Sequence, residues 1–286
     1  MKKSLLTSAL ALAAFAVPSA SFAAEEAAKP NTGALTFGLD TTLTTAYFFR
    51  GYNQEDGGII LQPNVNVSFL AVDTDDVDVS LKVGSWNSFH SQRTAGTGMW
   101  YESDLYAIAT VALSNGLSFN VGYTDYTYPD PSFKSIQELG ISTVYDYTKL
   151  LPESVKGLGG TVSLATYKEI DDGNGSEDWY WEVGVNPSYS VDVDVPGMGK
   201  PTLTFPITLG GSFDGYYAKS DGSNNVLGYL DVGVAAACPL GVPSKYGTWT
   251  LTVRGDWLHL FADSAEFANN GEDNQFIGSV NVALSY

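Results

Sequence analysis

Segments in which apolar and polar residues alternate run along most of the chain, and this pattern constrains the fold more than any other feature. A period of two residues is typical of a β-strand with one apolar and one polar face. The apolar face of the C-terminal segment consists of Phe276, Gly278, Val280, Val282, Leu284 and Tyr286. The sequence therefore ends on a predicted strand.

About twelve such segments, each near ten residues long, can be recognised. They lie at 34–47, 63–72, 77–86, 101–113, 117–126, 136–147, 161–170, 179–193, 202–210, 226–237, 248–261 and 275–286. The stretches between them are rich in Gly, Asn, Asp and Pro, which is typical of turns. Because no helical period of useful length accompanies them, we predict an all-β fold.

Two architectures cover the apolar faces of such strands. A soluble β-sandwich packs these faces together, whereas a membrane barrel turns them toward lipid and points its polar faces inward. The polar faces here are mostly Thr, Ser, Asn and Gly with isolated charges, which suits a wet or hydrogen-bonded lumen. We predict a transmembrane antiparallel up-and-down β-barrel of about 12 strands over residues 34–286. An exported β-sandwich that binds a ligand is the alternative.

The first residues have the features of a secretory signal peptide. Two lysines precede an apolar run over 5–17, and small residues stand at Ser21 and Ala23. Since the run is shorter than a membrane-spanning helix, we expect cleavage after Ala23 and export, so residues 1–23 are the predicted signal peptide. Residues 24–33 are predicted to form a flexible N-terminal lead.

The composition excludes one class of partner and one kind of covalent framework. Loss of the signal peptide leaves 12 of the 14 basic residues against 32 acidic ones, a net charge of roughly −20. No nucleic-acid partner is expected, because binding phosphates requires a basic surface. Cys238 is the single cysteine, so an intrachain disulfide is excluded.

Aromatic residues gather near the ends of the predicted strands. Membrane barrels carry aromatic girdles at both interfaces of the bilayer. The predicted membrane-interface aromatics are Tyr47, Trp100, Trp179, Trp181, Trp257 and Tyr286, with Tyr101 and Phe261 in similar positions. A terminal aromatic on an alternating strand also resembles the C-terminal assembly signal of outer-membrane proteins, which implies recognition by the barrel-assembly machinery.

Alternation assigns seven acidic and two basic side chains to the barrel interior. These pore-lining candidates are Asp40, Lys82, Glu102, Asp104, Glu138, Glu182, Asp231, Arg254 and Asp256. Charges of one sign inside a low-dielectric wall concentrate counter-ions, so one hypothesis is a cation-preferring channel. The other hypothesis is a network of internal ion pairs and hydrogen bonds that fills a narrow barrel.

Residues 44–69 contain a distinctive run that includes Phe49, Arg50, Gly51, Gln54, Asp56, Gly57 and Gln62. This run resembles the first hairpin of the TorF-like porin family, and residues 82–88 are similar to that family's second hairpin. The resemblance covers the first quarter of the chain. It implies an outer-membrane barrel of porin type and supplies no catalytic residues.

Arg50 stands where the first predicted strand meets its loop, beside Gly51 and near Asp56. Three roles are open for its side chain: it clamps the loop, folds into the pore mouth, or pairs with an acid at the surface. The sequence alone leaves these alternatives open.

Residues that could support catalysis or metal binding are sparse. His90 and His259 are the two histidines, and no motif supplies the third group that would orient His90 beside Ser88 or Ser91. The acidic segments 73–76 and 171–178 lack the spacing of a dedicated calcium loop, so plain solvated turns are favoured. We expect no enzymatic activity, no cofactor and no metal site.

These features together predict an outer-membrane channel for passive diffusion of small polar or cationic solutes. Its expected partners are outer-membrane lipid, the barrel-assembly machinery and those solutes. The alternative is a non-conducting barrel that acts as a scaffold, an adhesin or an envelope-assembly partner.

Overall fold

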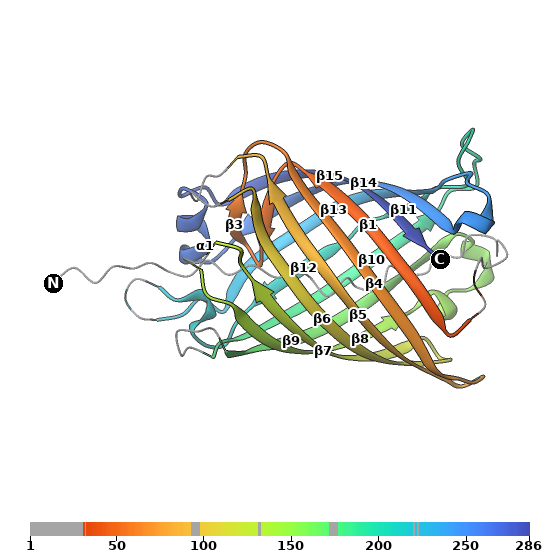
Figure 1. Ribbon diagram of the computed structural model, residues 1–286, viewed down its shortest axis with the longest axis horizontal. Helices are drawn as coiled ribbons and strands as arrows, with labels where there is room; N and C mark the ends of the chain where they lie inside the picture. Colours follow the sequence, from red (N-terminus) through yellow and green to blue (C-terminus); the bar gives the residue numbers. More distant parts are fainter. Residues whose placement is uncertain are drawn as a thin grey trace.

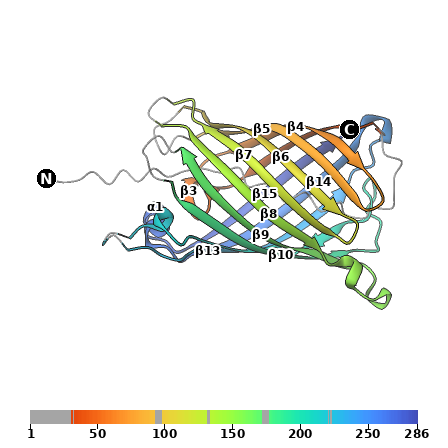
Figure 2. The same cartoon turned by 90° about the horizontal axis from the view of Figure 1, so that it is seen from below.

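The computed structural model describes residues 31, 33–92, 98–130, 133–171, 177–219, 221 and 223–286. The predicted signal peptide 1–23 and nearly all of the predicted lead 24–33 lie outside these ranges. Figure 1 and Figure 2 show one barrel of long, tilted strands, seen from two perpendicular directions.

The wall is one antiparallel sheet closed on itself. Its strands are β1 (Leu35–Thr44), β4 (Ile60–Asp73), β5 (Val77–His90), β6 (Trp100–Leu113), β7 (Leu117–Thr127), β8 (Ile136–Asp146), β9 (Leu158–Asp171), β10 (Trp179–Ser190), β11 (Thr202–Thr204), β12 (Ile207–Gly211), β13 (Leu227–Pro239), β14 (Thr248–Leu260) and β15 (Asn274–Ser285). Strands that follow each other along the wall pair in order, and β15 pairs with β1 to complete the ring.

The short strands β11 and β12 are two parts of a single wall strand. Both pair with β10 on one side and β13 on the other, and the register continues unchanged from β11 into β12. Pro206 lies between them and has no N–H to donate, although its carbonyl still accepts a hydrogen bond from Gly233 at 2.8 Å. The barrel therefore has twelve wall strands, which confirms the predicted fold class.

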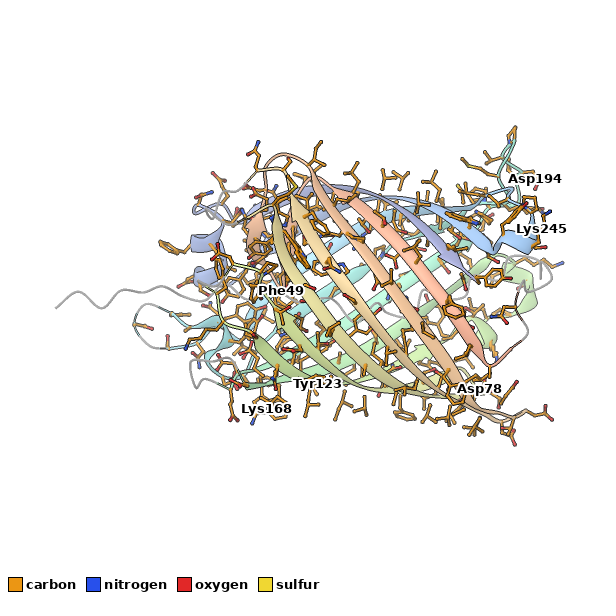
Figure 3. All side chains as sticks on the ribbon, viewed as in Figure 1. Phe49, Asp78, Tyr123, Lys168, Asp194 and Lys245 are labelled. Atoms are coloured by element: carbon orange, nitrogen blue, oxygen red, sulfur yellow. The ribbon has the colours of Figure 1, made fainter. Side chains whose placement is uncertain are left out.

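The alternating apolar and polar residues of the strands form the outer and the inner surface of the barrel. Leu39, Val65, Leu105 and Val253 lie on the outer surface with 43–59% of their area exposed. Figure 3 shows side chains projecting outward all along the barrel. A belt of exposed apolar side chains is unfavourable in water and is the surface that bilayer hydrocarbon covers. None of the helices in the described ranges has the length and apolar character needed to cross a membrane.

The two ends of the barrel differ in their connections. At the turn end, β4–β5 and β6–β7 are joined by short turns, and the 3₁₀ helices η1 (Thr148–Leu150), η2 (Glu153–Val155) and η4 (Ser244–Tyr246) lie in longer connections. Tyr286 reaches the same end, where its backbone exchanges two hydrogen bonds with Phe37, at 2.7 and 2.9 Å. The last residue thus takes part in closing the barrel.

The opposite end, the loop end, carries additional structure. It includes the hairpin of β2 (Tyr47–Phe49) and β3 (Tyr52–Glu55), the 3₁₀ helix η3 (Gly215–Tyr217) and the short helix α1 (Asp263–Ala268). In Figure 1 and Figure 2, β3 and α1 lie at the end of the barrel away from the C-terminus. Two clusters of buried hydrophobic side chains form here, and both include residues of the hairpin. The core of this molecule is therefore the filling of one barrel end.

Candidate functional site: a plug at the loop end

The hairpin 47–55, which we call the plug, folds into the barrel because its turn is tight. Arg50 and Gly51 form a two-residue turn and both have positive φ angles, 46° and 85°. Two positive φ angles match the type I′ turn of β-hairpins, in which a non-glycine residue such as Arg50 is uncommon. All residues of the plug except Phe48 and Asn53 are buried.

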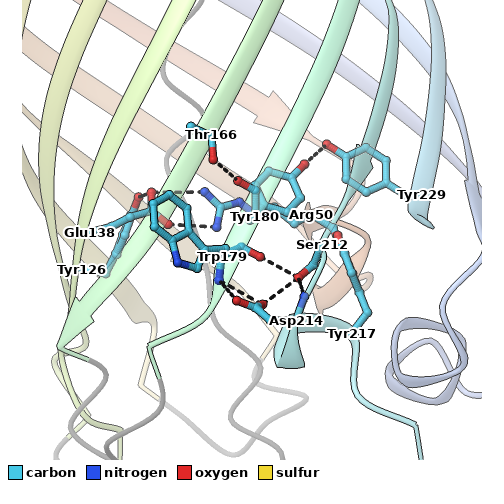
Figure 4. A network of polar contacts seen from close by, with 10 residues as sticks. All are labelled: Arg50, Tyr126, Glu138, Thr166, Trp179, Tyr180, Ser212, Asp214, Tyr217 and Tyr229. Atoms are coloured by element: carbon cyan, nitrogen blue, oxygen red, sulfur yellow. Dashed lines mark hydrogen bonds and ion pairs between the residues drawn. The ribbon is translucent and has the colours of Figure 1, made fainter. Parts of the chain in front are cut away.

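Arg50, at the tip of the plug, forms a buried ion pair with Glu138 of β8. Nη2 of Arg50 donates a hydrogen bond to Oε1 of Glu138 at 3.1 Å, and Nη1 lies 2.9 Å from Oε2. Tyr126 donates a hydrogen bond to the same Oε1 at 3.2 Å (Figure 4). The side chains of the pair are only 3% and 1% exposed, so the surface role considered for Arg50 is wrong.

Aromatic rings surround the guanidinium group. Its central carbon lies 3.9 Å from the ring centre of Tyr180, 4.6 Å from that of Tyr167 and 5.4 Å from that of Tyr216. A cation over an aromatic face is attracted by the ring quadrupole, and more strongly where water is excluded. We call Glu138, Tyr167, Tyr180 and Tyr216 the cation cage.

The charge of Arg50 is maintained inside the cage. Burial by itself lowers the pKa of the guanidinium, but the Glu138 carboxylate and the neighbouring tyrosines shift the pKa in the opposite direction, and the net result is an increase. Arg50 is therefore a permanent cation at the tip of the plug.

Contacts from the rest of the loop end hold the backbone of the plug. Tyr217 of η3 donates a hydrogen bond to the carbonyl oxygen of Arg50 at 2.8 Å (Figure 4). Tyr52 stacks on Tyr217 with ring centres 5.7 Å apart, and its hydroxyl lies 2.8 Å from both the carbonyl oxygen of Tyr216 and Oγ of Ser264. Burial raises the pKa of Tyr52 to about 12, so its hydroxyl remains protonated and can donate.

The other side of the plug contacts β6. Tyr47 donates a hydrogen bond to Glu102 at 2.9 Å, and Tyr101 donates one to Gln54 at 2.6 Å. Glu102 also interacts with Asp104, two residues along the same inward face. These contacts bury both acidic side chains completely, so in this structure Glu102 and Asp104 face packed protein.

Acidic groups outnumber basic ones in this filling. The buried acidic residues are Glu55, Glu102, Asp104, Glu138 and Glu169. Among the described residues, Arg50 is the one buried Lys or Arg side chain. The buried part of the loop end therefore has more acidic than basic side chains, with Arg50 as its permanent cation.

Ser88 and His90 are brought together on the inner face of β5. Oγ of Ser88 lies 2.9 Å from Nε2 of His90, and the ring of Tyr101 stacks on the imidazole with centres 4.6 Å apart. Ser88 is 0% and His90 2% exposed, so no substrate reaches this pair in the structure. The predicted strand 77–86 ends before His90, whereas β5 extends through it.

The lumen toward the turn end is polar and only partly buried. Asp40 accepts hydrogen bonds from Asn64 at 2.8 Å and Asn281 at 3.3 Å, and Tyr106 donates one to Asn64 at 2.9 Å. Lys82 is half-buried in the same region and interacts electrostatically with Asp40. The polar side chains of this half are thus less buried than those under the plug.

A second charged group lies on β13 and β14. Nε of Arg254 lies 2.7 and 2.9 Å from the two carboxylate oxygens of Asp256, and its Nη2 lies 3.6 Å from Asp231. Glu182 accepts a hydrogen bond from Tyr229 at 2.8 Å. The pore-lining candidates therefore fall into two sets: Glu102, Asp104 and Glu138 lie under the plug, while Asp40, Lys82, Glu182, Asp231, Arg254 and Asp256 lie outside its most buried part. Their role in permeation stays a prediction.

The aromatic residues predicted for the membrane interface differ in their exposure. Trp100 and Trp179 are 46% exposed and Tyr286 is 44% exposed, while Trp181 and Trp257 are partly exposed. Tyr47 corrects the prediction, because it lies on the plug and is only 6% exposed. The predicted strand 34–47 was extended past its end at Thr44, where the chain turns inward.

Tyr101 is likewise wrong as an interface residue. The β5–β6 register shifts between Ser88 and Phe89, so Tyr101 and Glu102 are both buried although they are neighbours in the chain. This bulge and the partners of Arg50 had no local signal in the sequence. Tyr216 and Tyr217 were also missed, since they belong to a loop that alternation does not describe.

The structure places no metal cluster on the calcium candidates. Across the described ranges, no group of three or more His, Cys, Asp or Glu side chains could hold a metal ion. The segment 73–76 forms the turn between β4 and β5, and 172–176 lies outside the described residues. The expected absence of cofactor and metal stays a prediction.

One comparison with a solved structure supports the barrel fold. An outer membrane channel from Pseudomonas putida F1 is 9% identical, with a TM-score of 0.51, and the alignment covers 88% of this chain and 96% of that one. The NanC porin is 10% identical, with a TM-score of 0.43, and the alignment covers 87% of this chain and 98% of that one. At 9% identity, the likeness to the Pseudomonas putida channel extends to the barrel fold alone.

No curated protein matches the sequence. A family described as "bacterial protein of unknown function (Gcw_chp)" matches residues 27–186, which include the plug, the first seven wall strands and most of β10. The more specific likeness to TorF-like porins is not tested by this match. Because the match spans more than half of the sequence, the chain belongs to the Gcw_chp family.

Proposed function

We propose that this chain is an outer-membrane channel for small polar or cationic solutes, and that the plug closes its loop end in the resting state. One observation carries the proposal: a polar lumen with half-buried charges leads to a barrel end that is filled by a separate hairpin rather than by the wall itself. The likeness of residues 44–69 to TorF-like porins supports the same function.

The charge of the interior supports a preference for cations. Asp40 lies in the partly buried lumen toward the turn end, and Asp231 and Asp256 lie on β13 and β14 nearer the loop end. Lys82 and Arg254 are the opposing basic groups among the described pore-lining candidates. Acidic groups behind a low-dielectric wall attract cations and repel anions. The proposal includes export, outer-membrane lipid around the wall, assembly through β15 and no enzymatic activity.

The alternative function is a non-conducting barrel. The burial of the Arg50–Glu138 pair favours it, because a plug that never leaves would make the barrel a scaffold for its loops. The two functions predict different currents from the same protein.

Single-channel recording in planar bilayers tests the proposal. We expect brief cation-selective openings of the wild-type protein and longer openings of Arg50→Ala, since the tip of the plug then loses its ion pair. Lys200→Ala is the matched control, because it removes an exposed ion pair with Asp192 at the turn end. Reversal potentials in a KCl gradient give the selectivity.

The outcomes separate the functions. Anion preference would contradict the role of the inward acids. Absence of current from folded wild-type and Arg50→Ala proteins would reject the channel and leave the scaffold function.

A further inference from the structure

We propose that the cation cage is a binding site for guanidinium-bearing small molecules, and that Arg50 is its tethered occupant. This inference deepens the proposed function by naming the class of solute, and it rests on that function for its biological meaning. The site itself is argued from contacts that do not depend on conduction.

The four residues of the cage lie outside the plug, although Phe49 of the plug adds a further ring 4.9 Å from the guanidinium carbon. Glu138 lies on β8, Tyr167 on β9 and Tyr180 on β10, and Tyr216 lies on η3. The loop before η3 is anchored to the wall independently, because Asp214 accepts hydrogen bonds from the backbone N–H of Trp179 at 3.0 and 3.1 Å (Figure 4). The cage therefore has supports that remain when the plug is displaced.

The geometry of the cage selects a planar organic cation. A carboxylate with one oxygen facing each terminal nitrogen matches the fork of a guanidinium, and the ring of Tyr180 at 3.9 Å covers the face of that group. A metal ion prefers several oxygen ligands, whereas the groups here are one carboxylate and aromatic rings. The arrangement thus fits arginine-like or agmatine-like molecules.

The surroundings favour a positive occupant. With Arg50 withdrawn, Glu138 would lose its ion-pair partner, and the other charged side chains of the filling, Glu102, Asp104 and Glu169, are acidic as well. A carboxylate in a low-dielectric site is unfavourable without compensating positive charge, so either another cation or a proton compensates for withdrawal of the plug. A neutral solute of the same shape would not replace Arg50.

The plug is attached in a way that permits this exchange. The chain leaves the wall at Thr44, the end of β1, and returns to it at Ile60, the start of β4. These two residues are paired with each other, so the wall is hydrogen-bonded without the plug. A free guanidinium compound and Arg50 then compete for the same carboxylate, and the ligand both fills the cage and releases the plug.

Chemical rescue tests the site. Arg50→Ala removes the guanidinium group from the cage. Thermal unfolding of this variant in detergent micelles is then recorded by circular dichroism at a series of methylguanidinium chloride concentrations. We expect a saturable rise of the unfolding midpoint with half-effect at roughly millimolar concentration. N-methylurea, the neutral analogue, should produce no saturable rise, and Arg50→Ala/Glu138→Gln should not respond to methylguanidinium.

Competition in the protein with Arg50 intact provides a second measurement in case Arg50→Ala does not fold. Cys238→Ser removes the native thiol, and Gln54→Cys places a new thiol in the plug at a buried position. The new thiol reacts with a thiol reagent only when the plug leaves the barrel. Agmatine at ten times its dissociation constant should raise the labelling rate about tenfold. N-methylurea should leave the rate unchanged.

The results distinguish this inference from the channel proposal. If methylguanidinium produces no saturable stabilisation and agmatine does not change the labelling rate, the binding site is rejected whatever the currents show. Equal effects of the cation and the neutral analogue reject it as well. Saturable binding without current would retain the site and reject the channel.

Discussion

The ion pair at the tip of the plug gives the most direct test of the structure. Glu138→Gln leaves the Arg50 cation buried without its carboxylate, and we expect a loss of about 3–5 kcal/mol in the free energy of unfolding. Arg50→Ala leaves a buried carboxylate and also removes the contact with the ring of Tyr180, so its loss should be at least as large.

A double-mutant cycle isolates the interaction. In Arg50→Ala/Glu138→Gln neither charge remains, so the combined loss should be smaller than the sum of the single losses by about 2–3 kcal/mol. The free energy is measured by urea unfolding of the protein in lipid vesicles, with the folded fraction read from tryptophan fluorescence. Urea is required, because guanidinium chloride would supply a ligand for the cage.

The exposed pair of Lys200 and Asp192 is the matched control. Its side chains are 50% and 89% exposed, so the same cycle there should give additive losses within experimental error. Additive losses at Arg50 and Glu138 as well would refute the reasoning, since they would mean that the two groups do not stabilise each other inside the barrel.

Three further predictions concern the wall. Val253→Arg places a charge on the lipid-facing surface and should cost about 2–4 kcal/mol in vesicle unfolding, whereas Thr252→Arg, on the lumen side, should cost much less. Deletion of Tyr286 removes two backbone hydrogen bonds to Phe37, about 1 kcal/mol each, and should lower the folded yield in a heat-modifiable gel assay. Gly84→Val puts a side chain into the space that the Tyr106 side chain occupies. It should lower the free energy of unfolding by about 1–3 kcal/mol, which is measured as a lower midpoint of thermal unfolding.

The wall could be predicted from the sequence because its pattern is local. A strand that separates lipid from a polar lumen must alternate at every position, so Leu39 and Asp40 already reveal their faces. The Pro206 interruption did not disturb this prediction, since the register continues across it.

The plug could not be predicted in the same way. Arg50 and Glu138 are 88 residues apart, and Tyr52 and Ser264 are 212 apart, so no local pattern joins them. The sequence did single out Arg50 and Glu138, each for a separate reason. The tight turn formed by Arg50 and Gly51 then reverses the chain direction at the tip of the plug.

The attachment of the plug has a consequence for how such barrels diversify. It is inserted between the end of β1 and the start of β4, where Thr44 and Ile60 are paired on adjacent wall strands. A segment inserted between paired neighbours can be shortened, lengthened or exchanged while the ring of backbone hydrogen bonds stays intact. The same twelve-stranded wall could accept a different hairpin, with different contacts closing the loop end, while the strand pairing of the wall stays the same.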